Sequence, residues 1–139
     1  MKKRFNWNKW TRKTHYWGAF VILLPVSVIF TSGIFLQLKK EINWIQPPTV
    51  SGGLSNNFSV SFDDILAAVQ SVEEAKIQSW NDVDRLDVRV EKGVVKVRGK
   101  NRWEVQVDTH TGEVLHVAYR RSDLIESIHD GSWFHEKVK

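Results

Sequence analysis

The sequence predicts an α+β protein in which one N-terminal transmembrane helix precedes a small domain made of a helix packed on a four-stranded antiparallel sheet. Residues 16–38 form an uncharged apolar run. Residues 62–75 carry apolar side chains at helical spacing, and the segments between residues 85 and 120 alternate apolar and polar side chains. These two periods are typical of an amphipathic helix and of half-buried strands.

The apolar run predicts a membrane span over residues 16–38. A helix of this length, at ~1.5 Å per residue, crosses a hydrocarbon core of ~30 Å. Pro25 cannot donate a hydrogen bond to the Val21 carbonyl, so we expect a kink there. A face of small and hydroxylated side chains follows, at Ser27, Thr31 and Gly33. Such a face lets a neighbouring helix approach closely, although the hydroxyls alternatively satisfy the backbone freed by Pro25.

A cleaved signal peptide is the alternative interpretation of this run. A signal peptide has an apolar core of ~7–15 residues followed by a small-x-small cleavage site. The run here is longer and ends at residues 37–40 without such a site. We therefore expect an uncleaved anchor.

Charge predicts the orientation of the chain. Six of the 20 basic residues and none of the 16 acidic residues fall within residues 1–13. The net charge of +4 is therefore the sum of +6 on this tail and −2 on the rest of the chain. A basic nucleic-acid-binding face on the folded domain is therefore not expected. The positive-inside rule places the tail, residues 1–15, in the cytoplasm and the domain on the other side. The absence of cysteine excludes disulfides and thiolate metal sites.

Beyond the span, residues 39–57 form a juxtamembrane segment and linker. Pro47 and Pro48 stop a helix, and the Gly/Ser/Asn-rich residues 49–57 predict a flexible connection. The folded domain is expected over residues 58–121. Ser61 is the predicted N-cap of a helix that ends near residues 74–75. Its apolar stripe consists of Phe62, Ile65, Leu66, Val69 and Val72.

Alternating segments predict strands over residues 85–91, 95–98, 103–108 and 115–120, joined by short turns. Four such strands make an antiparallel meander with one apolar face for the helix to cover. Residues 122–139 then form a short helix, capped by Ser122 and stopped by Gly131, and a tail that returns to the membrane surface.

The other face of this sheet is expected to be exposed and polar. We predict that it docks a partner through its arginines, Arg85, Arg89, Arg98 and Arg120. Cross-strand charge pairing is the alternative explanation of this face. The open edges of a meander additionally allow another chain to add a strand.

Several segments together resemble one family. They are Ser32-Gly33 in the span, LQLKKEINWIQPP at 36–48, DRLDVR at 84–89, EVQVDTHTGEVL at 104–115 and RRSDLIESIHDGSWF at 120–134. In this order they resemble the small PepSY-domain membrane proteins of bacteria. The resemblance implies an inner-membrane protein with a periplasmic PepSY domain of regulatory or inhibitory type. Such relatives usually continue into a second membrane helix, whereas this sequence is single-pass as given and stops at Lys139.

Larger members of the related family are associated with iron-siderophore reduction, and some are thought to hold haem through membrane histidines. His15 and His129 are the candidates for such a ligand here. A bis-histidine haem needs two histidines at similar depth, and these two are predicted on opposite sides of the membrane. We therefore expect no cofactor and no metal within this chain.

The sequence carries no nucleophile–base pattern, phosphate loop or zinc motif, so we do not expect an enzyme. The expected function is a membrane-anchored accessory or regulatory subunit that binds another envelope membrane protein. One alternative is an accessory subunit of a haem or iron membrane oxidoreductase. Another is an inhibitor of an envelope peptidase.

Overall fold

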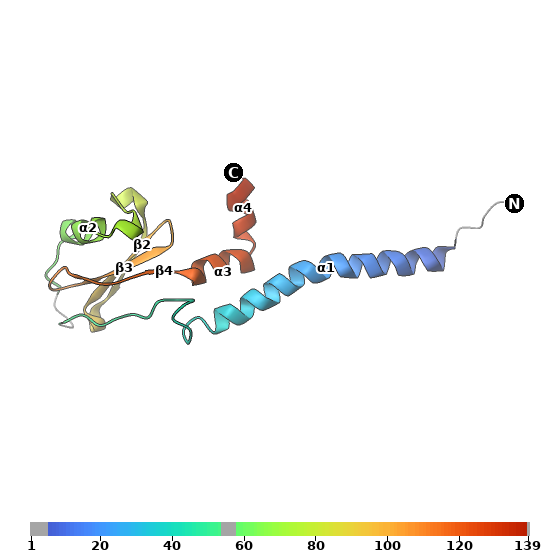
Figure 1. Ribbon diagram of the computed structural model, residues 1–139, viewed down its shortest axis with the longest axis horizontal. Helices are drawn as coiled ribbons and strands as arrows, with labels where there is room; N and C mark the ends of the chain where they lie inside the picture. The colour runs from blue at the N-terminus through green and yellow to red at the C-terminus, as the bar shows by residue number, and fades with distance from the viewer. Residues whose placement is uncertain (1–5, 54–57, 139) are drawn as a thin grey trace. The chain divides into compact units, whose positions relative to one another are not determined.

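The computed structural model describes residues 6–53 and 58–138 (Figure 1). The predicted α+β class is confirmed, because a long apolar N-terminal helix precedes a four-stranded antiparallel sheet with helices. The chain divides into two compact units, residues 38–124 and residues 1–37 with 125–139. The tail residues Lys2, Lys3 and Arg4, and residues 54–57 of the predicted linker, lie outside the described residues.

Helix α1, Trp7–Gln37, is the one described helix long and apolar enough to cross a membrane. It begins well before residue 16, because the Asn6 side chain accepts a hydrogen bond from the Lys9 backbone N–H (3.1 Å) and caps a start inside the basic tail. Pro25 lies inside the helix, as predicted. The axis of α1 changes direction midway along its length (Figure 1). Ser27 donates to the Leu23 carbonyl within the same helix (2.7 Å).

Helix α2, Phe62–Gln70, begins at the predicted cap. The Asp64 N–H donates to Ser61 Oγ (3.2 Å) while the Ser61 N–H donates to Asp64 Oδ2 (2.8 Å), which is a capping box. These bonds to the Ser61 side chain and backbone lower the pKa of Asp64. The helix ends before the predicted residues 74–75. Val72 is extended, and a 3₁₀ turn over Glu73–Ala75 follows.

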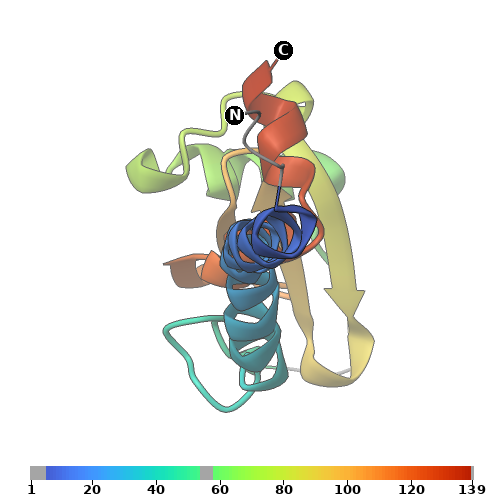
Figure 2. The same ribbon diagram turned by 90° about the vertical axis from the view of Figure 1, so that its right-hand side faces the viewer.

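The sheet has the predicted meander order, with every neighbouring pair antiparallel. Its strands are β1 Val83–Arg89, β2 Val94–Gly99, β3 Trp103–Asp108 and β4 Val114–Tyr119. The first strand stops at Arg89 instead of residue 91, because Val90–Lys92 forms a 3₁₀ turn closed by Gly93 at φ 61°. Figure 2 shows the yellow β1 beside β2 at one margin of the sheet.

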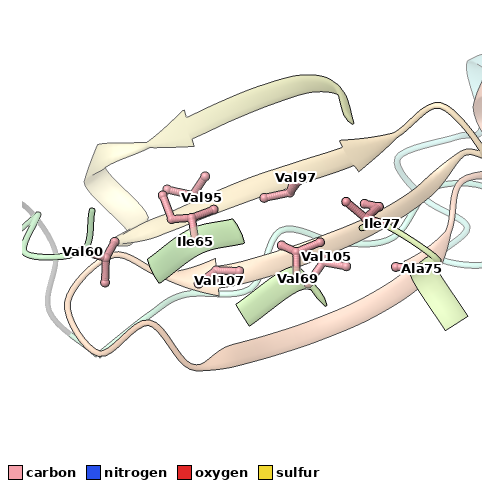
Figure 3. Packing of buried hydrophobic residues seen from close by; sticks show 9 residues of the cluster. All are labelled: Val60, Ile65, Val69, Ala75, Ile77, Val95, Val97, Val105 and Val107. Carbon is pink, nitrogen blue, oxygen red and sulfur yellow. The ribbon is translucent and has the colours of Figure 1, made fainter. Parts of the chain in front are cut away.

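The apolar core lies between α2 and the two central strands (Figure 3). Val95 pairs with Val107 and Val97 with Val105, so β2 and β3 present four valines to one face. Ile65 and Val69 of α2 pack on them, and all of these side chains are buried. Burying one such side chain contributes about 1.5–3 kcal/mol. The pale yellow β1 carries none of the core side chains labelled in Figure 3.

Two short helices follow the sheet, α3 Arg121–His129 and α4 Ser132–Val138. Ser122 is not the helix cap that the sequence predicted, because it lies inside α3. Its backbone N–H instead donates to the Ile45 carbonyl (2.7 Å). Gly131, at φ +79°, separates the two helices. Part of the predicted tail is therefore helical.

Candidate functional site

The segment predicted as a flexible connection is bound to the sheet over its described length. We call residues 45–53 the strap. Its Ile45 is buried, and its Gly52 N–H donates to the Lys92 carbonyl (2.7 Å). The Gly53 N–H donates to Asp108 Oδ2 (2.7 Å). The flexible connection predicted over residues 49–57 is thus hydrogen-bonded at Gly52 and Gly53, through distant partners that Gly/Ser composition cannot reveal.

Gln106 of β3 holds the centre of the strap. Its Nε2 donates to the Pro48 carbonyl (2.8 Å) and its Oε1 accepts from the Val50 N–H (2.9 Å). The side-chain amide thus pairs with the strap backbone much as a neighbouring strand would. Gln106 is completely buried, and Nε2 also donates to Glu104 Oε1 (2.8 Å), so its polar atoms are satisfied.

Charged side chains beside Gln106 are buried as well. Lys96 Nζ lies 2.9 Å from Glu104 Oε1, and the two side chains are only 6% and 3% exposed. Lys96 also donates to Thr49 Oγ1 of the strap (3.1 Å). The polar face of the sheet was expected to be exposed. That expectation is wrong here, because the strap covers this part of the face.

Arg120 completes the buried network. It pairs with Glu104 and with Asp123, and its side chain is 13% exposed. Burial alone would lower the pKa of Arg120, but the hydrogen bond to Glu104 and the charges of Asp123 and Glu104 raise it above its ordinary value. Arg120 is therefore a cation held in place by two carboxylates, and not a free docking group.

Beside the strap, this face opens into a charged cleft of about 360 Å³. Strand register explains its lining, because Arg85 is opposite Arg98, and Asp87 is opposite Lys96, on the face that points away from α2. The cleft is lined by Gln46, Thr49, Arg85, Leu86, Asp87, Arg89, Lys96, Arg98, Glu104 and Arg120. The structure thus brings the predicted arginines of β1, β2 and the end of β4 around one cavity.

These arginines differ in their partners. Arg98 pairs with Asp84 and with Asp123, and Arg89 pairs with Asp87 on the surface. Arg85 is exposed and makes no ion pair or hydrogen bond with any residue in the ranges 6–53 and 58–138. The cleft therefore holds a largely compensated charge network with one unpaired guanidinium at its mouth.

The remaining predicted residues belong to the unit that contains α1. Ser27 and Thr31 line an apolar groove with Phe35, Ile125 and Ile128. Gly33 lies under the His129 ring, whose Cε1 would be 3.4 Å from a β-carbon at that position. The predicted helix-partner face is thus contacted in part by the last turn of α3 of the same chain.

The two candidate histidines lie in different surroundings. His15 is exposed on α1. His129 Nδ1 lies 3.1 Å from the Ile29 carbonyl and 3.0 Å from Ser32 Oγ. His15 precedes Ile29 by about 20 Å along the helix axis, at ~1.5 Å per residue. The structure does not bring these two histidines together.

Within the part of the chain that the structure describes, no three His, Cys, Asp or Glu side chains are grouped as a metal site. Comparison with known proteins gives no further guide, because no family model, curated protein or solved structure matches this chain.

Sequence reasoning missed the strap contacts of Lys96, Glu104 and Gln106. One signal was present in the sequence. The register that the turns impose places Arg98 opposite Glu104 on the two central strands, which marks this face as charged, although Arg98 itself pairs with Asp84 and Asp123. What covers that face depends on a segment far away in the chain, which local pattern does not reveal.

Proposed function

We propose that this chain is a non-enzymatic, membrane-anchored module of PepSY type that docks another envelope membrane protein through the edge strand β1. The proposal rests on the resemblance of its ordered segments to PepSY-domain membrane proteins, on the apolar helix α1, and on the exposure of β1. Of these, the exposure of β1 is the observation that carries the docking role.

Strand β1 has an uncovered backbone edge and side chains available on both faces. Its neighbour in the sheet is β2, so its outer N–H and C=O groups face away from the ladder. On the α2 side, Val88 is 45% exposed although its cross-strand partner Val95 is completely buried. On the other side, Arg85 lines the mouth of the cleft. An edge with apolar and charged contacts suits the addition of a partner strand.

The other edge of the sheet provides a comparison. In β4, Leu115 is the one exposed residue, whereas β1 exposes Asp84, Arg85, Val88 and Arg89. Edge strands that remain open are liabilities unless a function uses them. We therefore assign docking to β1 and use β4 as the control edge.

The test is co-purification of the full chain from native membranes in mild detergent, followed by a native gel and mass spectrometry. The wild-type chain should migrate with a stoichiometric partner, and Val88→Lys should remove that partner because a charge on the edge opposes strand addition. Leu115→Lys is the matched control and should retain the partner. Equal retention by both variants would exclude docking at β1.

We also propose that residues 1–15 are cytoplasmic and that the sheet is periplasmic in a bacterial inner membrane. The basic tail and the positive-inside rule support this orientation. The absence of cysteine makes the test direct. A thiol introduced as Lys100→Cys should react with a membrane-impermeant maleimide in intact spheroplasts, and one introduced as Lys9→Cys only after lysis. The reverse pattern would overturn the orientation.

A second candidate function is an accessory subunit of a haem or iron membrane oxidoreductase, favoured by the setting of His129. The Ile29 carbonyl lies 3.1 Å from Nδ1, so in the tautomer with the proton on Nδ1 that nitrogen donates to the carbonyl and Nε2 is available to ligate a metal. Metal-binding histidines are commonly oriented by such a bond. The ring also lines a groove on α1, with Phe30, Ile34 and Gln37. His129 fits as one axial ligand, but His15 does not supply the second, so any haem would be shared with another chain.

This candidate predicts a Soret band in the complex extracted from native membranes. His129→Ala should shift or remove the band, while His15→Ala should leave it unchanged. Absence of a haem spectrum from a complex that retains its partner would exclude this candidate and leave the docking proposal intact. Co-purification of a peptidase whose activity falls on binding would instead support the inhibitor alternative.

A further inference from the structure

The charge pattern of β1 specifies what kind of segment the proposed docking edge accepts. Strand β1 points Arg85, Asp87 and Arg89 to the cleft side and Leu86 and Val88 to the α2 side. Asp87 already accepts hydrogen bonds from Arg89 Nε and Nη2 (3.1 and 2.7 Å). The edge thus presents a cation, an internally paired carboxylate and a second cation at alternate positions.

The charges that line the cleft favour an anion as the partner of Arg85. Lys96, Arg98 and Arg120 are each bound by carboxylates of Asp84, Glu104 or Asp123. Arg85 has no such partner among the described residues. A carboxylate that approaches the cleft from the β1 side would meet this guanidinium first, and Arg side chains bind carboxylates in a bidentate geometry.

We propose that β1 binds an acidic, extended segment of the partner protein, whose carboxylates pair with Arg85 and Arg89 while its apolar side chains cover Val88. The proposal rests on the docking function above. Opposite charges on directly opposed residues stabilise paired strands, so the favoured segment has acidic residues flanking a basic or neutral one at alternate positions. The intervening residues face the α2 side and are apolar, because Leu86 and Val88 lie there.

The probe is a capped synthetic peptide, Thr-Glu-Val-Lys-Val-Glu-Thr, against the same peptide with Gln in place of both Glu residues. Binding to the full chain in a neutral detergent is measured by fluorescence anisotropy, and its location by amide hydrogen exchange. We expect the Glu peptide to bind about tenfold more tightly than the Gln peptide, since charge-assisted bonds are the stronger ones. We also expect new protection over residues 83–89.

Matched variants separate recognition by Arg85 from bulk charge. Arg85→Gln should lower the affinity for the Glu peptide about tenfold. Lys100→Gln removes the same charge from an exposed turn between β2 and β3 and should leave binding unchanged. Arg85→Glu should instead prefer a peptide in which Lys replaces only the Glu that faces position 85, because Arg89 still requires a carboxylate. This reversal is a result that loss of folding cannot produce.

Several results would overturn the proposal. Equal affinities for the Glu and Gln peptides, or equal weakening by Arg85→Gln and Lys100→Gln, would show that the edge does not select acidic segments. Displacement of the peptide by inorganic phosphate, without protection of residues 83–89, would show a small-anion site instead of strand addition. If neither peptide binds while Val88→Lys still removes the native partner, docking at β1 is retained and only the acidic character of the partner segment is excluded.

Discussion

The two faces of the sheet are both covered, but by different means. On one face, α2 buries valines and isoleucines from a continuous apolar cluster. On the other, the strap buries Lys96, Glu104 and Gln106, which are polar. The first face needs only apolar surface, since hydrophobic burial is non-directional. The second needs a partner for every polar atom, because an unsatisfied buried group costs about 1–3 kcal/mol.

The difference teaches where this domain is adaptable. On the apolar face, a smaller side chain is accommodated, and the cost depends on the size of the cavity that it leaves. The strap face instead depends on a small number of specific hydrogen bonds and ion pairs, so a single polar change there should carry a large cost. The strap covers only part of this face, and the charged cleft lies between strap residues such as Thr49 and strand β1.

The largest expected effect comes from breaking the buried network. Glu104→Ala leaves Lys96 and Arg120 without their shared carboxylate and should reduce the free energy of opening of the β2–β3 amides by about 3–5 kcal/mol. Amide hydrogen exchange of the full chain measures this quantity. The double variant Lys96→Met with Glu104→Leu keeps Arg120 paired to Asp123 and should recover most of the loss. A loss below about 1 kcal/mol in the single variant would contradict the burial of the network.

On the apolar face, Ile65→Ala should cost about 2–5 kcal/mol, because the side chain is 1% exposed and leaves a cavity over the central valines. The same hydrogen-exchange measurement applies. Here no second substitution on the strap face should restore stability, since the two faces share no side chains. Recovery by such a substitution would mean that the faces are coupled through the sheet.

The strap itself is tested at its glycines. A β-carbon at Gly52 would lie 2.3 Å from the Gly93 carbonyl oxygen, whereas one at Gly53 meets nothing closer than 3.8 Å. Gly52→Ala should therefore detach the end of the strap and raise exchange over residues 45–53, at a cost of about 1–3 kcal/mol. Gly53→Ala is the matched control. Similar exchange in the two variants would contradict the described position of the strap.

Acid should weaken the attachment of the strap at Asp108. Hydrogen bonds from the Gly53, Thr111 and His110 N–H groups lower the pKa of Asp108 below its ordinary value. A carboxyl group whose pKa is lowered by folding adds stability that is fully present above its unfolded-state pKa of ~3.9. This stability is lost as the pH falls through the folded-state pKa. Wild-type protection of residues 45–53 should decline below about pH 4, and Asp108→Asn should remove this part of the pH dependence. An unchanged acid profile in the variant would show that other carboxylates are responsible.

The smallest effect is expected at the exposed pair of Arg89 and Asp87, whose side chains are 56% and 42% exposed. Arg89→Ala should change stability by about 0–1 kcal/mol, because water screens surface pairs. The difference between the stability losses in Arg89→Ala and Glu104→Ala measures how much burial under the strap increases the contribution of an ion pair. A cost as large as that of Glu104→Ala would show that this surface pair also supports the fold.

Local pattern predicted much of this molecule. The apolar run, the cap at Ser61 and the strand alternation depend on neighbours in sequence, so helix α1, the start of α2 and the meander could all be predicted. The length of α2 and the start of α1 could not be predicted from the apolar pattern. The backbone is extended at Val72, and the Asn6 side chain caps a helix start inside the basic tail. The arginines of the cleft were predicted as a group, but their pairing was not.

The sequence alone therefore determined the α+β class, the apolar helix and the alternation that gives the sheet two different faces, because these follow from the period of the side chains. The tertiary structure alone decided that the second face is covered, that Gln106 binds the strap, and that Arg85 remains without a partner among the described residues. The reason is physical: a side chain in a strand carries no local sign of which distant backbone will meet it.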